Sequence, residues 1–259
     1  MVKQANHRRA HGISVRERAY RYIKERISAG KLVAGSPVSE LLLAKELGSS
    51  RTPIREAMKQ LDAEGLLEQN PGGGMTVAQL KREDIVELYE LREALEVYSA
   101  GKIARQPVRP ADRDRLRLLV DQMLVLKKEL EESEAQSLGK EQNQRFIDCD
   151  LGFHALLMSL TNNARMQRMV NDTRLLIRIF AIRRSGHTAA QLEGIHESHR
   201  RILDAVVEQS PLQAMQAMAE HIQVSQQERL NEYDSWRRET ALRQHLPGIF
   251  EPKTQAGRP

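Results

Sequence analysis

A single glycine-rich segment, NPGGG at residues 70–74, does most to limit what this chain can fold into. It lies between two short β-compatible segments, LLEQ and MTV, and this arrangement predicts a β-hairpin. No second stretch of the 259 residues has the same pattern. A small hairpin after several short helices is typical of a winged helix-turn-helix, so we expect that fold in the N-terminal part of the chain.

Three short helices are predicted ahead of the hairpin. Apolar residues recur at helical spacing from Val15 onward. Glycine and serine mark the helix ends, because glycine readily ends a helix and serine caps its N-terminus. The segment LVAGSPVSE, between the first two helices, is expected to form a turn. The predicted helices run from Val15 to Gly30, from a cap at Ser39 to Gly48, and from a cap at Ser50 through Arg51 to Gly65.

The rest of the chain is predicted to be almost entirely helical. Aromatic residues make up only 4% of the chain, and Leu, Ala, Glu, Arg and Gln are abundant, which favours helices over sheets. Proline, asparagine and serine residues interrupt the helical pattern. The expected helices cover residues 83–105, 111–136, 142–160, 163–184, 189–208 and 211–235. The predicted fold is therefore mainly α, with a winged helix-turn-helix followed by an antiparallel helical bundle.

The excess positive charge is confined to the first third of the chain. Residues 1–80 contain 13 Lys and Arg against 8 Asp and Glu, whereas residues 81–259 contain 27 of each kind. An anionic partner is therefore expected at the N-terminal domain. The single cysteine, Cys149, excludes an intrachain disulfide and fits a reducing compartment. No apolar run approaches the roughly 20 residues that span a bilayer, so we expect a cytoplasmic protein with no membrane partner.

The third predicted helix has an apolar face and a basic face. The apolar face consists of Ile54, Met58 and Leu61. The basic face consists of Arg51, Arg55 and Lys59, with Thr52 beside them. An ordinary solvated helix can also carry such a basic face. The tight turn before the helix, the hairpin after it and the charge asymmetry together favour insertion into the major groove of double-stranded DNA.

The segment SRTPIREAMKQLDAEGLL, residues 50–67, resembles the recognition helix of the GntR family of bacterial transcription regulators. By this resemblance, Arg51 and Arg55 read bases and Ser50 and Thr52 hold phosphates. The same resemblance places Gly74 at the tip of the wing, near the minor groove.

Two positions depart from the family pattern. Leu41 stands where the second helix often carries an arginine, and Gly73 stands where the wing often has a basic residue. Both departures predict weaker or altered contact with DNA. A flexible basic arm at residues 1–12, which contains Lys3, Arg8 and Arg9, could offset the loss by binding phosphates.

Four residues of the helical part have the chemistry of metal ligands. Asp150 and His154 lie four residues apart on one face of a predicted helix, and His199 and His221 lie on two later helices. Three imidazoles and a carboxylate suit a borderline divalent ion such as Zn²⁺, Ni²⁺ or Mn²⁺, and a helical bundle can bring them together. A single histidine is more often a surface or a satisfied core residue. We expect that of His7, His11, His187, His196 and His245, although His196 lies only three residues from His199.

The motifs around these four residues resemble the FCD domain, the helical effector-binding domain of FadR-type GntR regulators. They are Asp-x-x-Phe-His from Asp150, His-x-x-Ile-Leu-x-Ala from His199, and Met-x-x-His ending at His221. The resemblance covers roughly residues 13–235. In the metal-binding branch of these domains one Asp and three His bind the ion, and Asp150, His154, His199 and His221 match them one by one. The resemblance therefore implies a metal site that takes a small organic acid.

Arg92 is a second candidate for contact with such an acid. It lies between Leu88 and Leu95 on the inward stripe of its helix, where a charge is unusual. A buried arginine needs an anionic partner. Glu96 could simply be that partner; alternatively, Arg92 holds the carboxylate of the effector.

These expectations combine into a homodimeric transcription regulator, most simply a repressor, that binds a palindromic operator and responds to a small carboxylate. The winged helix-turn-helix is expected to cover residues 13–79, and the effector-binding and dimerisation domain residues 83–235. A C-terminal tail covers residues 236–259, and its last part, LPGIFEPKTQAGRP, is expected to be loose. Two alternatives keep the metal but change its role, since the chain could sense the ion itself or hold it as a structural element. A metal-dependent hydrolase, with Glu193 or Glu197 as general base, is a third, but no cofactor loop or nucleophile motif supports an enzyme.

Overall fold

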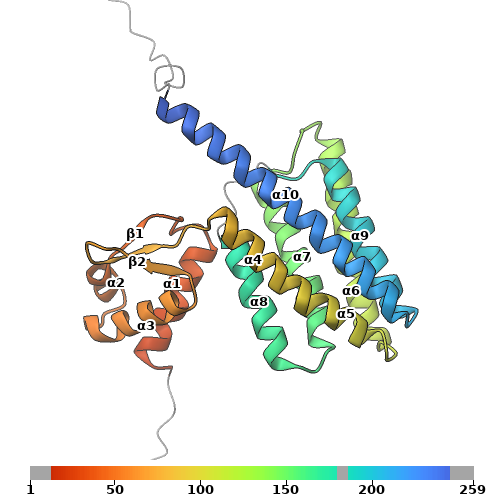
Figure 1. Cartoon of the computed structure of the whole chain (residues 1–259), viewed down its shortest axis with the longest axis horizontal. Coiled ribbons are helices and arrows are strands. Elements are labelled where there is room, and N and C mark those ends of the chain that lie inside the picture. The colour runs from red at the N-terminus through yellow and green to blue at the C-terminus, as the bar shows by residue number, and fades with distance from the viewer. Residues whose placement is uncertain (1–12, 180–185, 246–259) are drawn as a thin grey trace, which may run out of the picture. The chain divides into compact units, whose positions relative to one another are not determined.

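The computed structural model describes residues 13–179 and 186–245, and the chain divides into two compact units between Gln79 and Leu80 (Figure 1). The predicted basic arm and residues 246–259 lie outside the described residues. The N-terminal unit begins with helices α1 (Val15–Ser28), α2 (Glu40–Glu46) and α3 (Arg51–Ala63). Ser14 and Ser39 cap α1 and α2 by accepting hydrogen bonds from backbone N–H groups, as serine does at helix N-termini. The three predicted helices are therefore present, each within two residues of its expected ends.

A three-stranded antiparallel sheet completes this unit, in the order β1-β3-β2. Strands β2 (Leu67–Gln69) and β3 (Met75–Val77) form the predicted hairpin. The N–H of Gly73 donates to the carbonyl of Asn70 at 2.9 Å, and that of Asn70 donates to Gly74 at 3.0 Å. Gly73 and Gly74 have φ values of 88° and 83°, which only glycine adopts without strain. The wing therefore depends on the glycines that identified it.

Strand β1 (Pro37–Val38) is a correction to the turn expected at LVAGSPVSE, since it pairs with β3. A strand of two residues is too short to show the alternation of buried and exposed side chains that identifies a strand in a sequence. A proline also argues against one, except at a sheet edge, where its missing N–H is not needed. The order β1-β3-β2 places Pro37 at such an edge.

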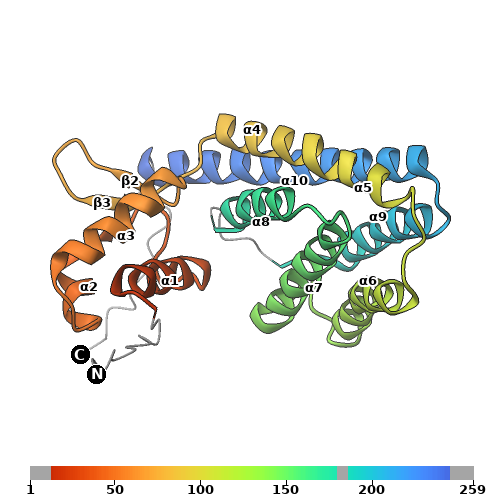
Figure 2. The same ribbon diagram turned by 90° about the horizontal axis from the view of Figure 1, so that it is seen from below.

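The C-terminal unit is a helical bundle. One continuous helical segment forms its first part: α4 (Arg82–Arg92), the π-helical turn η1 (Glu93–Val97) and α5 (Tyr98–Ile103). Figure 2 shows α10 running beside this segment. Helix α6 packs against α7 and α9, and α9 packs against α10. The remaining helices are α6 (Pro110–Glu132), α7 (Lys140–Ser159), α8 (Ala164–Ile179), α9 (Ala189–Val207) and α10 (Pro211–His245).

The C-terminal end of α10 corrects a second expectation. The last helix was predicted to end at residue 235, with residues 236–259 as a C-terminal tail, but α10 continues to His245. Apolar spacing weakens after Leu230, which hides the helix from a periodicity argument. The sequence after Leu230 nevertheless contains no glycine or proline before Pro247, so nothing in it breaks a helix. Helices usually end before a proline, which makes Pro247 the first clear stop signal.

Two apolar clusters hold the bundle together. The larger contains Phe153, Leu157, Ile202 and Met218, all at 0% exposure, and the smaller contains Met123 and Leu126. None of the described helices is long and apolar enough to cross a membrane.

We expect Gly101→Ala to destabilise the bundle. A Cβ at Gly101 would lie 2.6 Å from Cγ of Met215 in α10, so the two helices would have to separate slightly, at a cost of about 1–3 kcal/mol. Gly194 in α9 is the matched control, because a Cβ there meets nothing within 4 Å. Gly194→Ala should stabilise the chain by up to about 1 kcal/mol through helix propensity. Urea unfolding of both variants checks this, and equal effects would contradict the close packing.

Candidate functional site

The basic face of α3 is exposed as predicted. Ile54, Met58 and Leu61 are buried beneath it, at 4% exposure or less. The side chains of Arg51, Arg55 and Lys59 are 60%, 52% and 61% exposed. Ser50 takes the N-cap position with an extended backbone but makes no capping bond through its side chain. Its exposed hydroxyl, that of Thr52 and the N-terminal N–H groups of α3 together form a surface suited to a phosphate.

Glu40, at the start of α2, is a partner of this basic face that the sequence did not indicate. Its carboxylate accepts a hydrogen bond from Arg51 Nε at 2.7 Å and two from Arg55, at 3.0 Å each. The two guanidinium groups are therefore held side by side. Next to Glu40, Leu41 is 68% exposed at the position where an arginine was expected.

The second candidate site lies inside the bundle, where three imidazoles converge. His154 of α7, His199 of α9 and His221 of α10 offer nitrogen atoms that all lie within 4.8 Å of one another. His154 and His199 are fully buried and His221 is 6% exposed. Asp150 lies one turn before His154, and its Oδ1 is 3.5 Å from His199 Nε2 and 3.9 Å from His154 Nε2. The structure thus brings together the four residues predicted to bind a metal.

The geometry of this cluster fits a shared ion. The Nε2 atoms of His154 and His199 face each other at 3.1 Å. Two nitrogen ligands at about 2.1 Å from one ion and at right angles to each other lie about 3.0 Å apart. On the far side of His221, its Nδ1 lies 3.1 Å from the Ser198 hydroxyl. Such outer contacts hold metal-binding imidazoles in a fixed orientation.

The electrostatics of the cluster favour neutral imidazoles, the form that binds metals. Burial lowers the pKa of His154, and burial together with the neighbouring His154 lowers the pKa of His199 to about 3. Burial and the other two imidazoles hold the pKa of His221 well below its ordinary value. Burial raises the pKa of Asp150, but its interactions with His154 and Arg174 outweigh that effect and lower the pKa overall. Three neutral nitrogen donors therefore converge, and one carboxylate oxygen lies beside two of them.

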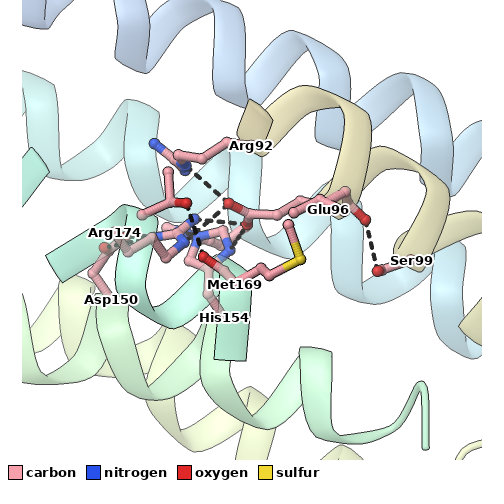
Figure 3. Close-up of polar contacts among 10 residues, drawn as sticks. Arg92, Glu96, Ser99, Asp150, His154, Met169 and Arg174 are labelled. Carbon is pink, nitrogen blue, oxygen red and sulfur yellow. Dashed lines mark hydrogen bonds and ion pairs between the residues drawn. The ribbon is translucent and has the colours of Figure 1, made fainter. Parts of the chain in front are cut away.

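A buried ionic network adjoins the cluster (Figure 3). Glu96, at 0% exposure, accepts hydrogen bonds from Arg92 Nε at 2.8 Å and from Arg174 at 3.1 and 2.9 Å. Arg174 also donates to Asp150 at 3.4 Å. Burial disfavours the charged form of Glu96, but Arg174 and Arg92 outweigh it and hold its pKa well below the ordinary value. Arg92 is thus paired with Glu96. This pairing is the simpler of the two roles predicted for Arg92.

Arg174 is the residue of this site that sequence reasoning missed. It lies on the same stripe of α8 as Val170 and Ile177, both buried. The argument that singled out Arg92, a charge on an apolar stripe, would have found Arg174 as well.

Of the other histidines, the two whose side chains the structure describes do not join the cluster. His196 points toward α6, with its Nε2 3.9 Å from Asp121 Oδ1. His187 is buried against the ring of Phe146, with its Nδ1 3.4 Å from Asn143 Oδ1. His7 and His11, and the side chain of His245, lie outside the described residues.

A winged helix followed by a helical bundle with a buried polar centre defines a DNA-binding protein with a second, helical domain. Residues 15–77 match the family described as "Bacterial regulatory proteins, gntR family", and residues 87–224 match the FCD domain. The chain belongs to the GntR family and carries the FadR-type combination of a winged helix-turn-helix with an FCD domain. Members of this family are transcription regulators that bind DNA, and they are not enzymes.

Individual relatives agree with this assignment. The chain is 31% identical to the "Probable D-xylose utilization operon transcriptional repressor" of Paenarthrobacter nicotinovorans, over 78% of this chain and 82% of that one. It is 29% identical to the HTH-type transcriptional regulator YdhC of Bacillus subtilis, over 78% and 85%. Among solved structures, McbR/YncC of E. coli has the same fold, with a TM-score of 0.67 and 20% identity over 86% of this chain and 100% of that one.

We expect Arg174→Met to destabilise the bundle by about 3 kcal/mol, because it leaves the buried charge of Glu96 with one arginine fewer. Arg145 is the matched control, since it bonds to Glu129 at 2.7–3.0 Å in an exposed setting. Arg145→Met should cost less than about 1 kcal/mol. Urea unfolding followed by the fluorescence of Trp236, the single tryptophan, reports on the helical domain. Similar losses in the two variants would show that the buried network adds no more than a surface pair.

Proposed function

We propose that this regulator is a homodimeric repressor whose affinity for a palindromic operator is controlled by a small organic acid bound at a metal ion in the helical domain. The convergence of His154, His199 and His221, with an oxygen of Asp150 3.5 Å from His199, is the observation that carries the proposal. The FCD domain is associated with metal binding, and the donor set suits Zn²⁺, Ni²⁺ or Mn²⁺.

An acidic effector follows from the ligands and from the charges around them. Four protein ligands leave two positions of a six-coordinate ion for other donors, and carboxylate or hydroxyl oxygens are suitable. The side chain of Asp150 is 25% exposed, whereas those of the neighbouring His154 and His199 are fully buried, so the site is open on the aspartate side. Arg174 and Arg92 add two positive charges next to it, and in this proposal Arg92 uses its Nη donors on the effector because its Nε is engaged by Glu96.

The relatives indicate which acids to test. One is named for the repression of D-xylose utilisation, and another is the gluconate operon repressor of Bacillus subtilis, 25% identical over 70% of this chain and 68% of that one. Both names concern sugars or sugar acids. A panel of sugar acids and short hydroxy acids, with neutral sugars as comparison compounds, is therefore the right starting set.

The regulatory step needs two arrangements of the dimer that bind the effector with different affinity. In one arrangement the two recognition helices do not fit the operator half-sites. An effector that favours this arrangement lowers the affinity of the protein for DNA. By linkage, operator DNA must weaken effector binding by the same factor. The two halves of this proposal can be measured separately.

The metal half predicts effector stabilisation that depends on the ion. At about 100 times its dissociation constant, an effector stabilises the folded state by about 2.7 kcal/mol, which a thermal-shift screen detects easily. We expect a hit from the acid panel with metal-loaded protein and none after removal of the metal. Replacement of His199 and His221 by Ala should abolish metal retention, while His196→Ala, three residues from His199, should leave it unchanged. A full metal load in the double variant would contradict the assigned ligands.

The DNA half predicts different losses for two residues of α3. Operator fragments for this test are selected from random double-stranded DNA with the wild-type protein. Arg55→Ala should weaken operator binding roughly 5- to 150-fold and relax the preference at its base pair, because it removes a base contact. Lys59→Ala should weaken all sequences alike and reduce the salt slope by about 1. An Arg55→Ala protein with unchanged affinity and sequence preference would contradict the role of α3.

A further inference from the structure

The carboxylate of Glu96 contacts a candidate metal ligand as well as two arginines. Its Oε1 accepts from Arg92 and Arg174, and its Oε2 accepts from Arg174. The same Oε2 lies 2.8 Å from Nδ1 of His154, within hydrogen-bonding distance. His154 therefore has a carboxylate on its Nδ1 side and the other candidate ligands on its Nε2 side.

The 2.8 Å contact decides which tautomer of His154 is favoured, although its angle is not that of a hydrogen bond. A lone pair on Nδ1 would repel a carboxylate oxygen at this distance, so the neutral ring beside Glu96 carries its proton on Nδ1. The lone pair is then on Nε2, the atom that faces His199 Nε2 at 3.1 Å and Asp150 Oδ1 at 3.9 Å. With the opposite tautomer, an N–H group would point into the place where an ion must sit. The contact with Glu96 thus selects the form of His154 that can bind a metal.

The backbone at Glu96 is unusual in a way that fits this role. Glu96 lies within η1, the π-helical turn between α4 and α5. The hydroxyl of Ser99 donates to the carbonyl of Leu95 at 2.7 Å, which stabilises the local distortion (Figure 3). Single π-helical turns are rare and occur most often at functional sites. Arg92, Glu96 and Ser99 lie on one buried stripe that crosses this turn.

We propose that Glu96 is the positioning residue of the metal centre: its carboxylate holds His154 in the Nδ1–H tautomer with Nε2 directed at the ion. This inference rests on the proposed metal site. Glu96 itself binds neither the ion nor the effector. Its contacts with Arg92 and Arg174 keep the carboxylate ionised and in place, so that the buried charges and the imidazole orientation form one unit. Loss of such an outer carboxylate typically lowers metal affinity 10- to 100-fold.

The test compares Glu96→Gln with Glu129→Gln. Gln has the shape of Glu but no charge, and its amide can turn an N–H toward His154. Glu129→Gln makes the same chemical change in α6, at a carboxylate that is 36% exposed and bonds to Arg145. Zn²⁺ affinity is measured on the full-length protein by competition with a chromogenic chelator. We expect a 10- to 100-fold loss for Glu96→Gln and less than about a threefold change for Glu129→Gln.

A second variant and a second measurement guard against misfolding. Glu96→Asp keeps the negative charge for the arginines but draws the carboxylate back by one methylene, so it should fold and still lose metal affinity. ¹⁵N NMR of the metal-stripped wild-type protein should show His154 in the Nδ1–H form, and Glu96→Gln should show a mixture of tautomers. A folded Glu96→Gln protein with wild-type affinity would overturn the inference, as would equal losses in Glu96→Gln and Glu129→Gln. A wild-type protein that binds no metal at all would instead overturn the proposed function.

Discussion

The helical domain is organised around one buried carboxylate, that of Glu96. It is fully buried, yet it is paired with arginines from α4 and α8 and lies within hydrogen-bonding distance of a histidine from α7. Burying these charges is costly, and an apolar cluster of the same volume would often be as stable or more so. The network therefore fixes the positions of the helices that it joins more than it stabilises the fold. Its contacts tie α4, α7 and α8 to one another, and they hold His154, the imidazole that α7 contributes to the cluster.

The sequence predicted the parts of this structure that depend on strong local rules. Gly73 and Gly74 supply the positive φ values that the hairpin needs, and Ser39 caps α2 as predicted. Ser50 occupies the predicted N-cap position of α3 but makes no capping bond through its side chain, and the cap at Ser14 was not predicted. The ligand set of Asp150 and three histidines was predicted from i, i+4 spacing and from family motifs, and the structure places these residues together; whether they bind a metal is the proposal made above.

What the sequence could not show depends on tertiary contacts. Strand β1 exists only because β3 lies beside it. The π-helical turn at Glu96 has no sequence signature of its own, because the residues EALEV would suit an ordinary helix equally well. Arg174 is separated from Glu96 by 78 positions, so its partner could not be read from helical spacing. A charge on an apolar stripe indicates that some partner exists, but only the fold shows which one.

The position of Glu96 along the chain bears on how a ligand signal could reach DNA. Strand β3 of the wing ends at Val77, and α4 begins at Arg82, so a short connection joins the DNA-binding unit to the helix that leads to η1. A π-helical turn and an ordinary α-helical turn differ by one residue per turn, so a change at η1 would rotate and shift α4 relative to its neighbours. Packed helices change between discrete arrangements rather than deforming gradually. In the function proposed above, occupancy of the metal centre acts on His154, His154 contacts Glu96, and Glu96 belongs to η1, the element that continues directly from α4.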